Sequence, residues 1–210
     1  MDMSVRVENL DKKYGDKILF SDFNMKIEEG EMVAITGDSG KGKTTLLNIV
    51  SGLERADKGN IYINEKLNPF HNKKDSIQLY REEISFLFQN YALINDITVE
   101  ENIDIALKYI SRFERREKKE AALKRVGLES KKKEKVYKLS GGEQQRVALA
   151  RIMVKKSSII LADEPTGALD PTNRARVISI LKDFQKEGKS VLIVTHDPVV
   201  AKECQRIIQL

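Results

Sequence analysis

The sequence has little that would suit an oxidising compartment or the interior of a membrane. Its one cysteine, Cys204, excludes an internal disulfide framework and favours a reducing compartment. No apolar run approaches the roughly 18 residues that a membrane-crossing helix needs. The first ten residues lack the cationic-then-apolar order of a secretory signal. We therefore expect a cytoplasmic protein, with Cys204 inert.

The sequence also lacks internal repeats and low-complexity segments of the kind that separate domains. Its 210 residues are enough for one large domain with a subdomain. A composition of 33% charged and 40% hydrophobic residues is typical of a globular protein. We predict a single domain over residues 1–210, with no regulatory domain after Leu210.

Positive charge is concentrated in one segment. From Arg112 to Lys138 there are twelve Lys or Arg against five Glu, while the net charge of the whole chain is only +5. Such a face can meet anionic lipid, nucleic acid or an acidic partner, but a solvated helical surface is the simpler interpretation. His71 lies in a polar stretch and is interpreted as a surface residue.

Short apolar or alternating runs predict strands along most of the chain. They cover residues 4–7, 23–28, 31–37, 59–64, 83–90, 157–163 and 190–197. Helical spacing predicts helices over 44–53, with Leu53 on the apolar face, and over 170–188, where Asp170 would be the N-cap. This alternation indicates a parallel sheet with helices on both faces.

The segment from about residue 90 to 140 interrupts the alternation and is interpreted as a helical insertion. Thr98 and Glu101 have capping-box spacing, which predicts a helix that continues through Ile110. A second helix, rich in Lys and Glu, is expected to end at Gly127.

The segment ITGDSGKGKTT, at 35–45, concentrates glycine and lysine between an expected strand and an expected helix. It matches the pattern G-x-x-x-x-G-K-[ST], in which the backbone N–H groups of the loop and of the helix N-terminus face phosphate oxygens. Lys43 can contact the β- and γ-phosphates, and the Thr44 hydroxyl can bind Mg²⁺. The predicted nucleotide-binding residues of the loop are Gly37, Asp38, Ser39, Gly40, Lys41, Gly42, Lys43, Thr44 and Thr45.

Two acids end the apolar run IILADEP. Asp163 is positioned to hold Mg²⁺, and Glu164 to polarise the water that attacks the γ-phosphate. A purely structural role is the alternative, but adjacent acids have little use at a buried strand end without a cation. The loop, the acidic strand end and the alternation of elements predict an α/β fold: a P-loop core with a parallel sheet and an inserted α-helical segment.

With LSGGEQQR at 139–146, just before the acidic strand, the chain resembles the ATPase cassettes of ABC transporters over essentially its whole length. Ser140, Gly141 and Gly142 open an expected helix, so a hydroxyl and free N–H groups form a second anion site. In the family this signature completes the nucleotide site of the opposite cassette. The resemblance implies the full fold class: α/β, a P-loop NTPase (RecA-like) core with a parallel sheet, an N-terminal antiparallel β subdomain and an inserted α-helical subdomain. It also implies a head-to-tail dimer of two copies with ATP at the interface.

The resemblance also assigns roles to residues outside these motifs. Tyr14 matches the aromatic residue that stacks on adenine, Gln89 the glutamine that senses Mg²⁺ and water, and His196 the histidine at the γ-phosphate. Asp170 ends GALD, the loop that crosses to the second cassette and helps to form its nucleotide site. Lys41 and Ala168 depart from the usual family residues, without an expected loss of activity. The candidate catalytic residues are Lys43, Gln89, Glu164 and His196, and the candidate Mg²⁺ ligands are Thr44, Gln89 and Asp163.

The leading interpretation is an ATP- and Mg²⁺-dependent transporter subunit that lies at the inner face of the cell membrane and binds a separate integral membrane permease. Residues 88–109, 141–152 and 163–170 resemble the branch with macrolide exporters, lipoprotein-release systems and the cell-division cassette. The NYALI stretch resembles ATPases of lactococcin-type bacteriocin exporters. Mechanical signalling across the membrane is an alternative. A soluble ATPase acting on nucleic acid is another, but the long coiled-coil or zinc insertions of such relatives are absent, so no nucleic-acid partner is expected.

Overall fold

The computed structural model describes residues 3–70, 72–108, 110–167 and 169–210, so the expectations for His71 and Ala168 lie outside the described residues. The strands are β1 (Met3–Tyr14), β2 (Lys17–Glu28), β3 (Met32–Thr36), β4 (Lys58–Ile63), β5 (Lys66–Leu67), β6 (Ile84–Leu87), β7 (Ile159–Asp163), β8 (Ser190–Val194) and β9 (Arg206–Gln209). The α-helices are α1 (Lys43–Ser51), α2 (Lys73–Glu82), α3 (Val99–Ala106), α4 (Arg112–Val126), α5 (Gly141–Met153), α6 (Pro171–Lys186) and α7 (Pro198–Lys202). Two 3₁₀ turns, Glu129–Lys131 and Val136–Lys138, lie between α4 and α5.

A five-stranded parallel sheet forms the centre, in the order β6-β7-β8-β3-β9. Every residue of β7 and β8 is buried, because their alternate side chains enter two different cores. In β3, for example, Val33 packs on the side of α1, while Met32 packs on the side of α5 and α6. Burial on both faces explains why these strands are continuous apolar runs.

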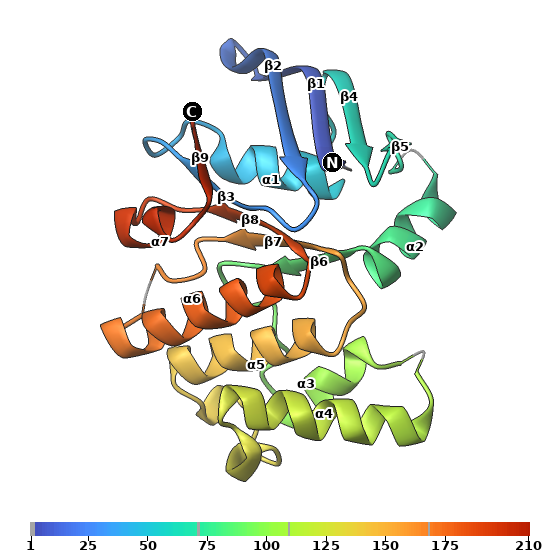
Figure 1. The fold of residues 1–210 in the computed structure, drawn as a ribbon, viewed down its shortest axis with the longest axis vertical. Coiled ribbons are helices and arrows are strands. Elements are labelled where there is room, and N and C mark those ends of the chain that lie inside the picture. Colours follow the sequence, from blue (N-terminus) through green and yellow to red (C-terminus); the bar gives the residue numbers. More distant parts are fainter. Residues whose placement is uncertain (1–2, 71, 109, 168) are drawn as a thin grey trace.

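The second sheet is antiparallel, in the order β2-β1-β4-β5, and lies against α1 on one side of the parallel sheet (Figure 1). Its strands alternate buried with less buried residues, as in β1, where the half-buried Arg6 lies between the buried Val5 and Val7. One face therefore packs on the core of α1, and the other faces solvent.

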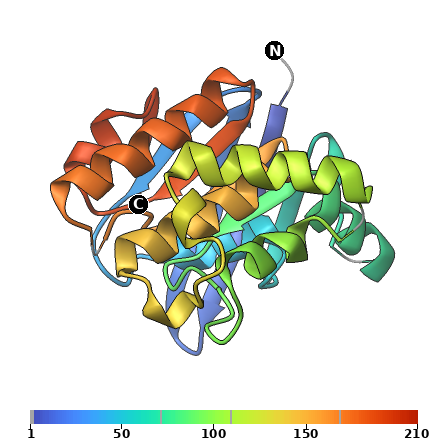
Figure 2. The same cartoon turned by 90° about the horizontal axis from the view of Figure 1, so that it is seen from below.

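The helices α3, α4 and α5 follow β6 and form a block at the opposite end of the molecule from the antiparallel sheet (Figure 1). Seen from below, α4 and α5 lie side by side under the parallel sheet (Figure 2). The predicted α/β fold class, with its antiparallel β subdomain and inserted helical subdomain, is confirmed. None of the helices in the described part of the chain combines the length and apolarity that crossing a bilayer requires.

The capping box of Thr98 and Glu101 is confirmed, but two helix boundaries were predicted wrongly. The helix α3 ends at Ala106, not Ile110, because Ser111 caps a new helix by accepting a bond from the N–H of Glu114. The helix α1 ends at Ser51, since Gly52 turns the chain in the left-handed region (φ 75°). Leu53 therefore lies outside the helix and is 51% exposed.

Candidate functional site

The loop between β3 and α1 has the shape expected of a phosphate-binding loop. Gly37, Gly40 and Gly42 all have positive φ (143°, 79° and 95°), which glycine adopts without strain. At Gly42 a Cβ atom would lie 2.9 Å from the ring of Phe20, so space as well as φ requires glycine there. The Lys43 ammonium donates to the carbonyls of Gly37 (2.7 Å) and Asp38 (2.9 Å), which holds a positive charge across the loop.

The acidic strand ends two strands away from this loop, because β8 lies between β7 and β3. The Thr44 hydroxyl nevertheless donates to Oδ1 of Asp163 at 3.1 Å. Burial raises the pKa of the Asp163 carboxyl, and the charge of Glu164 adds to this, while the bond from Thr44 and the charge of Lys43 oppose it. A buried carboxylate beside a hydroxyl suits Mg²⁺, which binds few protein oxygens and keeps several waters.

Glu164 is held in an unusual conformation beside His196. Its φ is +44°, which is uncommon for a residue with a side chain, and its N–H donates to the carbonyl of Val194 at 2.9 Å. Its Oε1 is hydrogen-bonded to Nδ1 of His196 at 2.8 Å. Its Oε2 is buried and has no hydrogen-bond partner in the described part of the chain. The carboxylate is thus fixed by one oxygen and has a second acceptor available.

A hollow in the surface is lined by many of these groups, although Gly37, Asp38, Lys41 and Asp163 are not among its lining residues. Its lining comprises Tyr14, Lys17, Leu19, Ser39, Gly40, Gly42, Lys43, Thr44, Thr45, Gln89, Glu164 and His196. Gln89 follows the end of the edge strand β6, Glu164 follows β7, and His196 follows the end of β8, the next two strands of the sheet in that order. The structure therefore brings together most of the predicted loop, catalytic and adenine-contacting residues.

Sequence reasoning missed Lys17, whose ammonium donates to the carbonyl of Gly40 at 3.1 Å. No ion pair of Lys17 with a carboxylate is found among residues 3–70, 72–108, 110–167 and 169–210. Lys17 is paired with Tyr14 across the β1–β2 hairpin. The two-residue turn Gly15–Asp16 between them was the signal that could have placed Lys17 beside the predicted adenine contact.

The signature residues do not line the hollow. Ser140 caps α5 by accepting a bond from the N–H of Glu143, whose carboxylate accepts from the N–H of Ser140. Ser140 and Gly141 are exposed, while Gly142 is buried and a Cβ atom there would lie 2.8 Å from Nδ2 of Asn173. The start of α5 is thus a capped and exposed helix N-terminus that does not line the hollow of its own chain.

Asp170 also lies outside the hollow. It caps α6 by accepting bonds at 3.0 Å from the N–H groups of Thr172 and Asn173. The Asn173 side chain donates to Asp170 and accepts a bond from Arg146 of α5. The signature helix and the Asp170 loop are therefore connected to each other through Asn173.

A glycine-rich loop between a buried strand and a helix, with an acidic pair at the end of a nearby strand, defines the P-loop class of nucleotide-binding proteins. The family model described as ABC transporter matches residues 20–167, and the chain belongs to that family. The predicted membership is confirmed, and the chain is an ABC-type ATPase cassette that binds ATP.

Curated relatives include proteins named as macrolide export ATP-binding/permease protein MacB. The chain is 40% identical over 212 residues to MacB 2 of Yersinia pestis bv. Antiqua (98% of this chain, 31% of that protein). It is 41% identical over 197 residues to MacB of Pectobacterium atrosepticum (93% and 30%). The chain thus spans about a third of the length of these relatives.

Solved structures agree over nearly the whole fold. The ATP-binding cassette MJ0796, in a dimeric post-hydrolysis state bound to ADP and Pi, superposes with a TM-score of 0.89 at 38% identity (98% of this chain, 94% of that one). The cassette cbiO1 of Clostridium perfringens, described as part of the transporter complex cbiONQ, has a TM-score of 0.89 at 30% identity (100% and 85%).

Proposed function

We propose that the chain is the ATP-hydrolysing part of an ABC exporter, in which ATP-driven closure of a head-to-tail dimer moves a separate membrane permease. The observation that carries the proposal is the division of predicted phosphate-binding groups between two places. Lys43, Thr44 and Glu164 meet at one hollow, while Ser140 lies apart on α5. Two copies arranged head to tail would bring each Ser140 to the hollow of the other.

The residues of the hollow have separate roles in this proposal. The loop N–H groups and Lys43 bind the β- and γ-phosphates. Gln89 contacts the attacking water, and Tyr14 contacts the base. Thr44, Gln89 and Asp163 would hold Mg²⁺, which supplies neutralisation of phosphate charge. A water that donates a hydrogen bond to Oε2 of Glu164 would be oriented for attack on the γ-phosphate, while His196 holds Oε1.

The membrane partner and the exported class are inferred from the relatives. Those named as MacB are ATP-binding/permease proteins, and this chain matches about a third of their length, as an ATPase unit would. We therefore propose that residues 1–210 form a single domain, which includes the helical subdomain of about residues 90–140. This domain would act with a permease at the inner face of the membrane. The exported molecule would be a macrolide or a peptide such as a bacteriocin.

Several cations of the basic segment are paired within the chain, which favours a solvated surface over a nucleic-acid site. Lys119 contacts Asp104 (2.8 Å), and Lys131 contacts Glu143 (2.6 Å). Arg125 contacts both an acid of α6 and the residue that follows that helix. These pairs reduce the local excess of positive charge on the helical block.

A mixing experiment tests the shared site. Lys43→Ala removes the loop cation from one chain, and Ser140→Arg blocks the signature of the other; we expect each variant alone to lose ATPase activity. A mixture should regain activity, because half of the mixed dimers' sites contain an intact Lys43 and an intact Ser140. The matched control mixes the Lys43→Ala chain with a chain carrying both substitutions, which should restore nothing. Absence of recovery in the first mixture, with wild type active, would contradict the proposal.

A further inference from the structure

Tyr14, the expected adenine contact, is fixed by a cluster of side chains that no motif of the sequence analysis included. Its hydroxyl donates to Oε1 of Glu54, and the residue is 49% exposed at the border of the hollow. The same carboxylate oxygen lies 2.9 Å from the ammonium of Lys12. Glu54 therefore connects the aromatic residue of one strand end to a cation two residues earlier.

Lys12 is placed where it can fix the ring as well. Its ammonium lies 4.9 Å from the centroid of the Tyr14 ring and donates to the carbonyl of Arg55 at 2.9 Å. The side chain of Lys12 is only 10% exposed, and Asp57 lies 3.9 Å away. A cation at this distance from a ring is attracted to its face, so one side of the ring is held by Lys12. Because Tyr14 borders the hollow and is half exposed, a base could stack on the other side of the ring.

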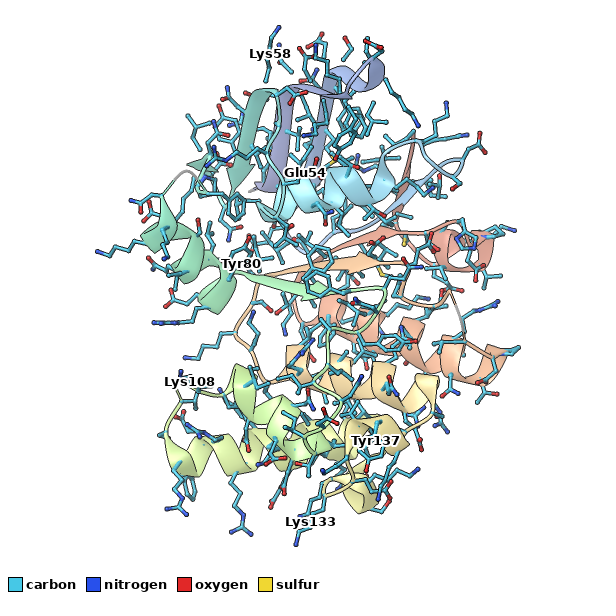
Figure 3. The ribbon with its side chains drawn as sticks, turned by 180° about the vertical axis from the view of Figure 1, so that it is seen from behind. Glu54, Lys58, Tyr80, Lys108, Lys133 and Tyr137 are labelled. Carbon is cyan, nitrogen blue, oxygen red and sulfur yellow. The ribbon has the colours of Figure 1, made fainter. Side chains whose placement is uncertain are left out.

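Glu54 is itself placed by the helix that follows the phosphate-binding loop. Gly52 ends α1 in the left-handed region, and a Cβ atom there would lie 2.2 Å from the ring of Phe70. The N–H groups of Leu53 and Glu54 both donate to the carbonyl of Asn48, which turns the chain back along α1. Figure 3 shows Glu54 between α1 and the antiparallel sheet, at the opposite end of the molecule from the helical block.

The electrostatics of the cluster keep all three groups in the protonation states that these contacts require. The hydrogen bond to Glu54 raises the pKa of Lys12 and that of the Tyr14 phenol. Burial raises the pKa of Glu54, but the bonds from Tyr14 and Lys12 outweigh it and the net pKa is lowered. The phenol and the ammonium are thus donors to an ionised carboxylate.

We propose that Glu54 and Lys12 are positioning residues for the nucleotide base: they fix the ring of Tyr14 with one face open, and so set the affinity for nucleotides but not for bare phosphates. The inference rests on the proposed role of Tyr14 in the hollow. It adds that α1 organises both ends of the nucleotide, since its N-terminus meets the phosphates and the turn after it holds the base contact.

The test compares ADP with inorganic pyrophosphate, which lacks the base, by titration calorimetry on the full chain. Losing the stacking ring in Tyr14→Ala should weaken ADP binding about tenfold. Glu54→Ala and Tyr14→Phe should each weaken it severalfold, because the ring remains but is no longer tethered. Pyrophosphate affinity should be unchanged in all three variants. In the Tyr14→Ala background, Glu54→Ala should have no further effect on ADP.

Two controls separate positioning from loss of structure. Glu187→Ala removes another ion-paired carboxylate, one that does not line the hollow, and should leave both affinities unchanged. If Glu54→Ala does not fold, Tyr14→Phe still tests the tether, because it removes only the hydroxyl. Unchanged ADP binding in the Glu54 and Phe variants while Tyr14→Ala is weakened would overturn the inference and leave the proposed function intact. Equal weakening of pyrophosphate would also overturn it, and a wild-type chain that binds neither ligand would overturn the proposed function itself.

Discussion

Replacing Glu164 by glutamine tests the proposed chemistry most directly. The substitution keeps the size of the side chain and one acceptor oxygen for the contact with His196, now 2.8 Å from Oε1. With that oxygen kept at His196, the substitution removes the negative charge and places an NH₂ donor at the buried position of Oε2, which has no partner in the described part of the chain. A water held there would no longer lose a proton to the side chain.

The expected loss follows from the usual contribution of a general base. We predict that Glu164→Gln lowers turnover by about 10²–10⁴-fold. This corresponds to about 3–5.5 kcal/mol of transition-state stabilisation, at about 1.4 kcal/mol per factor of ten. ATP affinity should change little, because the loop and Lys43 are untouched.

The assay is steady-state phosphate release together with size-exclusion chromatography in the presence of ATP. The variant should accumulate as an ATP-bound dimer, whereas the wild type should hydrolyse its ATP and separate. Glu203→Gln, on the turn after α7 where Glu203 pairs with Lys182, is the matched control and should behave as wild type. Near-normal turnover in Glu164→Gln would refute the assigned role of the carboxylate.

Three further outcomes are expected. Lys17→Ala should raise the KM for ATP about fivefold to tenfold with kcat little changed, as measured by initial rates, because a charged contact beside Gly40 is lost. Gly42→Ala should lower the free energy of unfolding by about 1–3 kcal/mol in a denaturant titration, because alanine is strained at φ +95° and its Cβ would meet Phe20. Because burial raises the pKa of Asp163, the carboxyl favours folding when protonated, and this stability is lost as pH rises through its folded pKa. In melting experiments without Mg²⁺ or nucleotide, Asp163→Asn should therefore raise Tm by a few degrees at pH 7 and by less at pH 3. In a separate assay with Mg²⁺ and ATP, the same variant should lose ATP hydrolysis.

The central sheet was predictable because its strands are buried on both faces. Runs such as Ile159–Asp163 contain almost nothing but apolar residues, and the helical spacing of apolar residues after the glycine-rich loop identified the following helix. The helix α2 was missed because only Leu79 of its ten residues is buried, so it has no apolar period. The edge strand β9 was missed for a related reason: it alternates half-buried and exposed residues over only four positions.

The site was predictable where one motif contains all the interacting groups, as in the loop around Lys43. The contacts between distant segments were not, since nothing in the spacing of Lys12, Tyr14 and Glu54 indicates that one carboxylate joins them. The contact of Thr44 with Asp163 spans 119 positions and was expected only through the chemistry of a shared cation. Local patterns thus identified the reacting groups, and the folded chain identified the residues that orient them.

Because Ser140 caps α5 and does not line the hollow, the activity should depend on the concentration of the chain. If each complete site needs groups from two chains, specific activity measured per chain must fall on dilution once pairs dissociate. A permease with two docking places would hold the chains at a high effective concentration, so that neither needs a strong affinity for the other. Weak self-association in free solution would then be compatible with rapid hydrolysis on the proposed permease, and binding to that permease would determine when the complete sites form.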